Sequence, residues 1–216
     1  MRPAPSCRSC PARSRPAAAR YPATARHPAA DRPHRRPRPQ AIDPLTLGLA
    51  DPAAGERAVG REPGFVVRTD GAARGNPGPA SCGGVLIDLA RADAHSPLAR
   101  PDASISDYLG VQTNNVAEYT GVMRAVRLAR DLGARRVELL LDSKLIIEQL
   151  HGRWRVKDAK LQPLWAETLR TLRGFPGGWS ANHVPRAQNS AADALANLAI
   201  DRVLAGGPES VVTRPG

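Results

Sequence analysis

Four acidic residues stand where the sequence predicts that strands end or helices begin. Asp70 lies late on a short apolar strand, and Asp142 directly follows the apolar run RVELLL (136–141). Glu118 lies in the first turn of a long helical pattern, on its inward stripe, and Asp193 lies in the first turn of an alanine-rich helix. A carboxylate among inward-pointing neighbours is costly unless a cation meets it. We therefore expect the four acids to share a cationic ligand.

The chemistry of such a cluster is that of a hard metal ion. Carboxylate oxygens suit Mg²⁺ or Mn²⁺ rather than zinc, and four of them repel one another strongly without cations between them. Two ions about 3.5–4 Å apart can clamp the attacking and leaving oxygens of a phosphodiester. Taken alone, Glu118 is explained as a helix-start acid and Asp142 as an N-cap. The four acids together favour a metal site.

The elements that position these acids follow from the pattern of the chain. Strands are predicted at 65–70, 80–88, 104–111, 136–141 and 179–184, and helices at 114–132, 143–150, 158–173 and 190–203. A glycine-rich loop joins the first two strands as a hairpin, so the first three strands form an antiparallel meander. Arg68 and Thr69 alternate with apolar residues as in a half-buried strand. We expect an α/β fold with the acids at one edge of a mixed sheet.

Charge is unevenly distributed over the 216 residues. The formal net charge is +11, but residues 1–60 contain 11 Arg and 4 acids, whereas residues 61–216 contain 20 Lys and Arg against 16 acids. Residues 1–62 are rich in Pro, Arg and Ala and show no sustained period, so we expect a disordered basic extension. Such an arm would bind nucleic acid by counterion release, or it is a solvated tail without a role.

The three cysteines, Cys7, Cys10 and Cys82, are too few for a disulfide framework, which makes the reducing cytoplasm the expected compartment. Cys7-Arg8-Ser9-Cys10 with downstream histidines is weak evidence for zinc. Cys82 is expected to be a small buried residue. No apolar run reaches about 18 residues, so no membrane span is expected.

The sequence resembles the type 1 ribonuclease H family over residues 63 to 203. The motifs that carry the resemblance occur in the family's order and spacing: TDGAARGNPGPAS (69–81), TNNVAEY (113–119), LLLDSKLII (139–147) and HVPRAQNSAADALAN (183–197). The resemblance implies a five-stranded mixed sheet, three strands antiparallel and two parallel, flanked by helices. This domain would span 63–205, followed by a flexible tail at 206–216. The chain looks most like actinobacterial members that lack the extra basic helix of the family.

The resemblance also implies a reaction and the residues that perform it. Cleavage of the RNA strand of an RNA–DNA hybrid would leave a 5′-phosphate and would use two Mg²⁺ ions, with Mn²⁺ as an alternative. The family's four metal-binding acids fall on Asp70, Glu118, Asp142 and Asp193. His183 falls on a mobile histidine that assists product release or proton transfer. Arg186 is the alternative holder of that role and a substrate-binding candidate, and a strand-end packing histidine is the ordinary explanation for His183.

Further positions of the family pattern imply contacts with the hybrid. Asn76 of the GNPG loop, Asn114 and Asn115 fall on residues that touch the RNA strand in the minor groove. Amide side chains can both donate to and accept from the 2′-hydroxyl, which distinguishes RNA from DNA. Thr113 resembles a phosphate contact on the DNA strand. The expected enzyme is a monomer that binds its hybrid by shape and backbone.

Two other functions remain open. A non-catalytic RNA- or hybrid-binding module on the same fold would be indicated by loss of any of the four acids, and all four are present. The nuclease domain of a reverse-transcriptase-like mobile-element protein would keep the acids, but the sequence contains no polymerase segment.

Overall fold

The computed structural model describes residues 62–215. The predicted basic extension, including Cys7 and Cys10, lies outside the described residues apart from its last position, Glu62. The described residues form one six-stranded sheet in the order β5-β4-β1-β2-β3-β6. Its strands are β1 (Gly64–Ala73), β2 (Gly78–Asp88), β3 (Ala103–Gln112), β4 (Arg136–Leu141), β5 (Trp179–His183) and β6 (Ser210–Thr213). The helices are α1 (Asn114–Asp131), α2 (Lys144–Leu150), α3 (Leu161–Arg173), a short 3-10 helix η1 (Arg186–Gln188) and α4 (Ser190–Leu204).

The strand directions agree with the prediction. β1 pairs antiparallel with β2, and β2 with β3, which makes the meander. β4 then adds parallel to β1 on the other side, and β5 adds parallel to β4. The carboxyl ends of β1, β4 and β5 therefore point the same way, which brings Asp70 and the segments after Leu141 and His183 to one end of the sheet.

The tail is where the structure differs from the predicted five-stranded sheet. Ser210–Thr213 pairs antiparallel with β3 as a sixth strand, so the predicted flexible tail is wrong for this segment. Arg202 of α4 donates to the carbonyl oxygens of Pro208 (2.7 Å) and Ser106 (2.6 Å), and Ser210 bonds to buried Asp107. These contacts hold the tail in place although its sequence shows no periodicity. They depend on residues of α4 and β3, so the sequence of the tail itself does not predict them.

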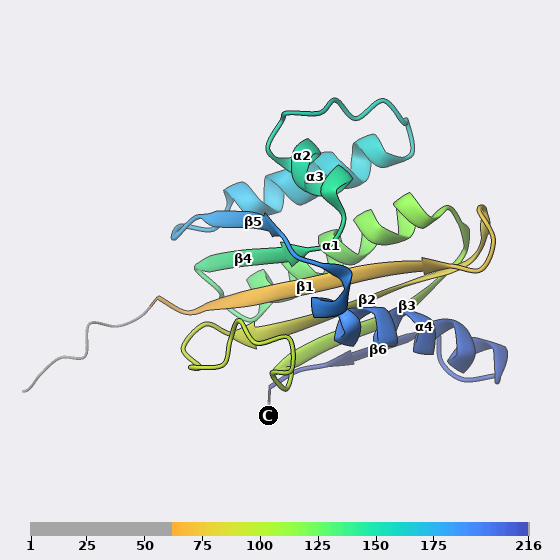
Figure 1. The fold of residues 1–216 in the computed structure, drawn as a ribbon, viewed down its shortest axis with the longest axis horizontal. Helices are drawn as coiled ribbons and strands as arrows, with labels where there is room; N and C mark the ends of the chain where they lie inside the picture. Colours follow the sequence, from red (N-terminus) through yellow and green to blue (C-terminus); the bar gives the residue numbers. More distant parts are fainter. Residues whose placement is uncertain (1–61, 216) are drawn as a thin grey trace, which may run out of the picture. The chain divides into compact units, whose positions relative to one another are not determined.

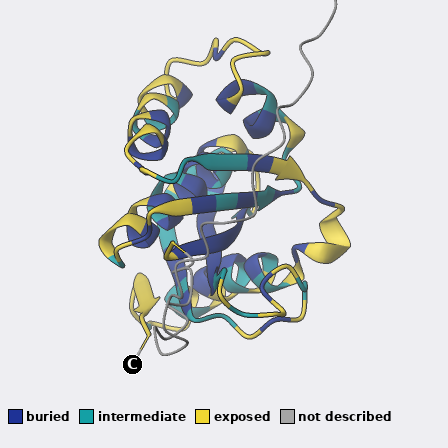
Figure 2. Cartoon of the chain, turned by 90° about the vertical axis from the view of Figure 1, so that its left-hand side faces the viewer, coloured by how far each residue is buried: buried dark blue, intermediate teal, exposed yellow. Residues whose placement is uncertain are grey.

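β1 is more deeply buried than predicted. Arg68 and Thr69 are 2 % and 4 % exposed, so the expectation of a half-buried strand was wrong. Both faces of β1 are covered, because α1, α2 and α3 pack on one side of the sheet and α4 on the other (Figure 1). The central parts of the strands are accordingly buried (Figure 2). The prediction that Cys82 is a small buried residue is confirmed, since its side chain is fully buried.

Two glycines let the helices approach the sheet closely. A Cβ on Gly71 would collide with the backbone of Ala117 and Glu118 at the start of α1. A Cβ on Gly83, which pairs with Asp70 across the β1–β2 ladder, would collide with the backbone of α4. Glycine is needed where backbones approach in this way. The two helices that carry Glu118 and Asp193 therefore rest directly on the strands beside Asp70.

The helix boundaries follow from recognisable caps. Thr113 is the N-cap of α1 and accepts a hydrogen bond from the amide of Val116. At the other end Gly133, at φ +81°, and Ala134 donate to the carbonyl oxygens of Arg130 and Ala129, which is a Schellman motif. α3 begins three residues later than predicted. Its predicted start, Asp158, instead accepts from the amides of Lys160 and Leu161 in a turn.

Within residues 62–215, no helix combines the length and the apolar character that a membrane crossing requires.

Candidate active site

Three of the predicted acids come together at the carboxyl ends of β1 and β4. Asp70 is on β1 and 8 % exposed, Asp142 directly follows β4, and Asp193 is in the first turn of α4. Burial raises the pKa of Asp70 to about 7, with the charge of Asp142 and then the hydrogen bonding and charge of Asp193 acting in the same direction. The amide of Gly71 donates to Oδ1 of Asp70 (2.8 Å) and opposes the rise. The three carboxyls are therefore near enough to interact.

Glu118 completes the group from the helix on the opposite face of the sheet. It is half-buried, and its two carboxylate oxygens accept from Nδ2 of Asn114 and Oγ of Ser143, each at 2.7 Å. Burial raises the pKa of Glu118, and the two hydrogen bonds oppose that rise while the charge of Asp142 adds to it. Ser143, at the N-cap of α2, was expected only to open a helix, but here it also orients Glu118.

Arg186 is the positive charge that all four acids share. Its guanidinium donates to Oδ1 of Asp193 at 3.0 Å, although its side chain is 78 % exposed. The bond to Asp193, followed by the charges of Asp70, Asp193 and Asp142, raises the pKa of Arg186. Its charge also favours ionised Glu118. Arg186 thus lies above the cluster on the solvent side.

His183 ends β5 beside Leu141, the residue that precedes Asp142. It is exposed, so the alternative of a strand-end packing histidine is wrong, and within residues 62–215 no hydrogen bond to its ring is formed. Of the two candidates for the mobile role, Arg186 touches the cluster and His183 stands free beside it.

Asn189 is a site residue that sequence reasoning missed. It is 1 % exposed, and its Nδ2 donates to Oδ1 of Asp142 and to the carbonyl of Thr69, both at 2.8 Å. It lies inside the motif 183–197, four residues before Asp193, yet nothing in its local pattern distinguishes a buried positioning amide from a helix cap. The link to Thr69, 120 residues away, is visible only in the folded chain.

The predicted hybrid-binding residues lie together beside Glu118. Asn76 of the β1–β2 loop accepts a hydrogen bond from the backbone amide of Asn114 through its Oδ1 (3.3 Å). Thr113 and Asn114 are half-buried, whereas Asn115 is exposed at the start of α1. Because Nδ2 of Asn114 is engaged by Glu118, its amide also orients an acid, which the sequence did not predict.

The chemistry of the donor set fits a hard divalent cation. Every candidate ligand offers carboxylate oxygens, and Oδ1 of Asp142 is already oriented by Asn189, as is usual for metal ligands with supporting hydrogen bonds. Among residues 62–215, no three His, Cys, Asp or Glu side chains are gathered as tightly as in an assembled metal centre.

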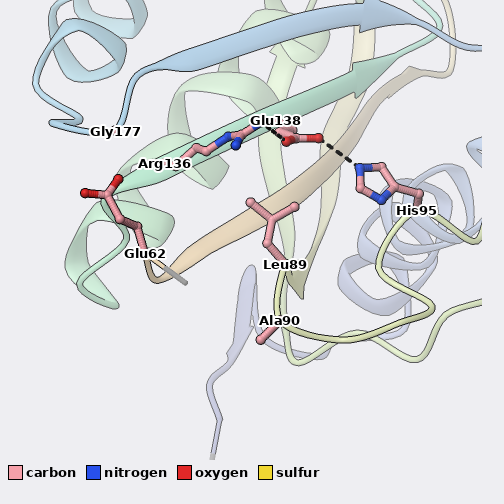
Figure 3. A pocket seen from close by; sticks show the side chains of 7 residues that line it. All are labelled: Glu62, Leu89, Ala90, His95, Arg136, Glu138 and Gly177. Carbon is pink, nitrogen blue, oxygen red and sulfur yellow. Dashed lines mark hydrogen bonds and ion pairs between the residues drawn. The ribbon is translucent and has the colours of Figure 1, made fainter. Parts of the chain in front are cut away.

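A separate cavity of about 350 Å³ lies at the opposite end of the strands (Figure 3). It is lined by Glu62, Leu89, Ala90, His95, Arg136, Glu138 and Gly177. Arg136 is the first residue of β4 and Asp142 follows its last, so the length of the strand separates the cavity from the acids. The cavity is not part of the acidic site.

The comparisons with known proteins agree with this geometry. The reverse transcriptase-like family matches residues 68–199, more than half of the chain. Ribonuclease HI of Halobacterium salinarum is 43 % identical over 136 residues, covering 61 % of this chain and 62 % of that protein. The bifunctional protein Rv2228c of Mycobacterium tuberculosis is 42 % identical over 63 % of this chain, but only 35 % of its own length is spanned. Ribonuclease H of Halorhodospira halophila is 35 % identical, with 63 % of this chain and 93 % of that protein covered.

Solved structures show the same likeness. RNase H1 of Halobacterium salinarum superposes with a TM-score of 0.57 at 40 % identity, covering 64 % of this chain and 98 % of that one. LC11-RNase H1, isolated from compost and solved in complex with an RNA/DNA hybrid, has a TM-score of 0.57 at 35 % identity over 65 % of this chain and 99 % of that one. On these matches, the chain belongs to the ribonuclease H family, in its type 1 branch.

Proposed function

We propose that this domain is an endoribonuclease that cleaves the RNA strand of RNA–DNA hybrids and leaves a 5′-phosphate. The observation that carries the proposal is the convergence of Asp70, Asp142 and Asp193 at one end of the sheet, with Glu118 beside them. Membership of the type 1 branch, with a relative solved on an RNA/DNA hybrid, supports the choice of substrate. The enzyme is proposed to act as a monomer in the cytoplasm.

We assign the metal-binding role to the same four acids, with two Mg²⁺ ions as the resident metals and Mn²⁺ as a substitute. When bound, such ions activate a water and stabilise charge on the leaving oxygen. Asp142 would be held in place for a metal ion by the hydrogen bond that Asn189 donates to its Oδ1. Glu118 would be oriented toward the cluster by Asn114 and Ser143.

Other residues around the acids would bind the hybrid or assist the release of product. Asn76, Asn114 and Asn115 would contact the RNA strand, where an amide can exchange hydrogen bonds with a 2′-hydroxyl. Thr113 would contact a phosphate of the DNA strand. His183 and Arg186 are exposed beside the acids, where either side chain can move toward the departing product. A cation there also lowers the cost of bringing a phosphate to four carboxylates.

Cleavage of a uniformly labelled hybrid tests the proposal. The full chain is incubated with the hybrid, and with matched duplex DNA, duplex RNA and single strands, in Mg²⁺, in Mn²⁺ and in EDTA. We expect cutting of the hybrid's RNA strand only, with metal only, and its loss in Asp70→Asn and Asp142→Asn variants that keep the circular dichroism spectrum of the parent. Wild-type cleavage in either variant would overturn the proposal. Hybrid binding without cleavage in any metal would instead favour the non-catalytic binding module.

A further inference from the structure

Arg68 is a buried arginine whose position no part of the proposed reaction explains. It lies on β1 two residues before Asp70, and alternation along a strand places both side chains on the same face. Val66 on that face packs in the cluster that includes Ala191 and Leu195 of α4. Arg68 is therefore enclosed between the sheet and α4, directly beside the position of Asp70, and is 2 % exposed.

Within residues 62–215, the guanidinium of Arg68 meets carbonyl oxygens rather than an acid. Its two terminal nitrogens donate to the carbonyl of Gln188 (2.9 Å) and to the carbonyl of His95 (2.8 Å), and its Nε has no partner. A buried charge without a counter-ion is a costly arrangement. If this position served only to bury apolar surface, leucine or methionine would stabilise the fold more than arginine. The buried guanidinium therefore indicates a role other than stability.

The two carbonyls belong to segments that approach β1 from different parts of the chain. Gln188 ends η1 and is followed by Asn189, the amide that holds Asp142 and Thr69. His95 lies in the β2–β3 loop, and its side chain points to Glu138 on β4 at 2.8 Å, as Figure 3 shows. Arg68 therefore joins two segments, and the one that contains His95 is anchored to the sheet through Glu138. The other is the segment that carries Arg186 and leads into α4.

We propose that Arg68 is a positioning residue for the acidic cluster. Its planar fork reaches both carbonyls at fixed geometry, which a single ammonium or an amide of shorter reach does not do. By holding Gln188 against β1, it sets the place of Asn189, and through Asn189 the place of Asp142. The inference rests on the proposed function, since it treats the acids as metal ligands.

The variants Arg68→Met and Arg68→Lys test this role. Methionine keeps length and apolar packing but removes both hydrogen bonds, and lysine keeps the charge with one of the two bonds. The matched control is Arg91→Met. Arg91 lies in the β2–β3 loop, and among the described residues its hydrogen bonds go to Asp93, Asp102 and the carbonyl of Arg100 rather than to the segment around Gln188. The readout is the half-saturating Mg²⁺ concentration of the site, obtained without substrate by fitting the dependence of the melting temperature on Mg²⁺ concentration.

We expect the half-saturating Mg²⁺ concentration to rise about 10-fold in Arg68→Met, less in Arg68→Lys, and not at all in Arg91→Met. With hybrid, kcat should fall in the same order while KM stays near the wild-type value. Unchanged Mg²⁺ saturation in Arg68→Met would overturn the proposal whatever the variant's melting temperature without metal. If that variant does not fold, wild-type saturation in Arg68→Lys overturns it.

The two proposals fail in different ways. A wild-type chain that binds Mg²⁺ but cuts no hybrid contradicts the proposed function, and the Mg²⁺ titrations of the Arg68 variants still decide the positioning role. A wild-type chain that cuts the hybrid, with Arg68 variants of wild-type Mg²⁺ saturation, contradicts the positioning role alone.

Discussion

The side-chain amide of Asn189 donates a 2.8 Å hydrogen bond to Oδ1 of Asp142 and shares the same nitrogen with the carbonyl of Thr69. One buried amide thus connects the end of β4 to β1 at the residue before Asp70. Metal ligands are commonly oriented by such outer hydrogen bonds. The distance between Asp70 and Asp142 therefore depends on Asn189, which is not itself an acid.

Replacement of Asn189 by alanine should therefore weaken the cluster without removing a ligand. We expect about a 10-fold loss in kcat or in Mg²⁺ affinity, and a loss of about 1–2 kcal/mol in unfolding free energy from the buried partners left unpaired. Steady-state cleavage and urea denaturation measure the two effects. Asn182→Ala, at an exposed position of β5, is the control and should change neither. Equal losses in both variants would contradict the assignment.

The stability of the metal-free protein should fall with rising pH because of Asp70. Its folded pKa of about 7 exceeds the ordinary value of 3.8, so the folded state holds the proton more tightly than the unfolded state. Stability from this group is present below about pH 4 and is lost as the pH rises through 7. In EDTA at pH 8, Asp70→Asn should be more stable than the parent by about 2 kcal/mol.

Melting temperatures between pH 4 and 8 measure this effect as the difference between parent and variant. Glu118 contributes a slope of the same sign to both proteins, because its pKa is also raised by burial, and the subtraction removes it. Added Mg²⁺ should stabilise the parent and leave Asp70→Asn nearly unchanged. A parent and variant with parallel pH profiles in EDTA would show that Asp70 does not hold a proton in the folded state.

Arg186 should matter more than His183 in turnover. Arg186 contacts Asp193 and acts on all four acids, whereas His183 is exposed without a polar partner among the described residues. We expect Arg186→Ala to lower kcat about 10-fold and His183→Ala to lower it less than about 3-fold, both less than the roughly 10²–10⁴-fold that a positioned general acid or base contributes. Single-turnover and steady-state rates, compared at saturating hybrid, separate chemistry from product release. The reverse order of effects would assign the mobile role to His183.

Gly71→Ala should damage both fold and activity. The added methyl group would meet the backbone of Ala117 and Glu118, which cannot move aside without displacing α1. We expect a loss of about 1–3 kcal/mol in unfolding free energy, as for other overpacked sites, and a fall in kcat because Glu118 moves with its helix. Thermal melts and hybrid cleavage report the two losses. Ala72→Ser, next on β1 and partly exposed, should be tolerated; similar losses there would mean that β1 is sensitive throughout.

The sequence by itself determined the elements and the acids. Hydrophobic periodicity and the cap residues are local signals, so the strand at 136–141 and the start of α1 at Asn114 appear at the predicted places. The positions of Asp70, Glu118, Asp142 and Asp193 at element ends are also local, and the motifs around them carried the family resemblance. Their convergence followed once the strand directions were known.

Only the tertiary structure decided what holds those acids in place. Arg68 reaches the carbonyl of Gln188 and Asn189 reaches that of Thr69, each across 120 residues of chain, and β6 pairs with a strand about 100 residues away. Such contacts depend on which segments the sheet brings side by side, and a buried arginine on β1 has the same local pattern as an exposed one. Burial and long-range partners, rather than residue type, separate Arg68 from a solvated charge.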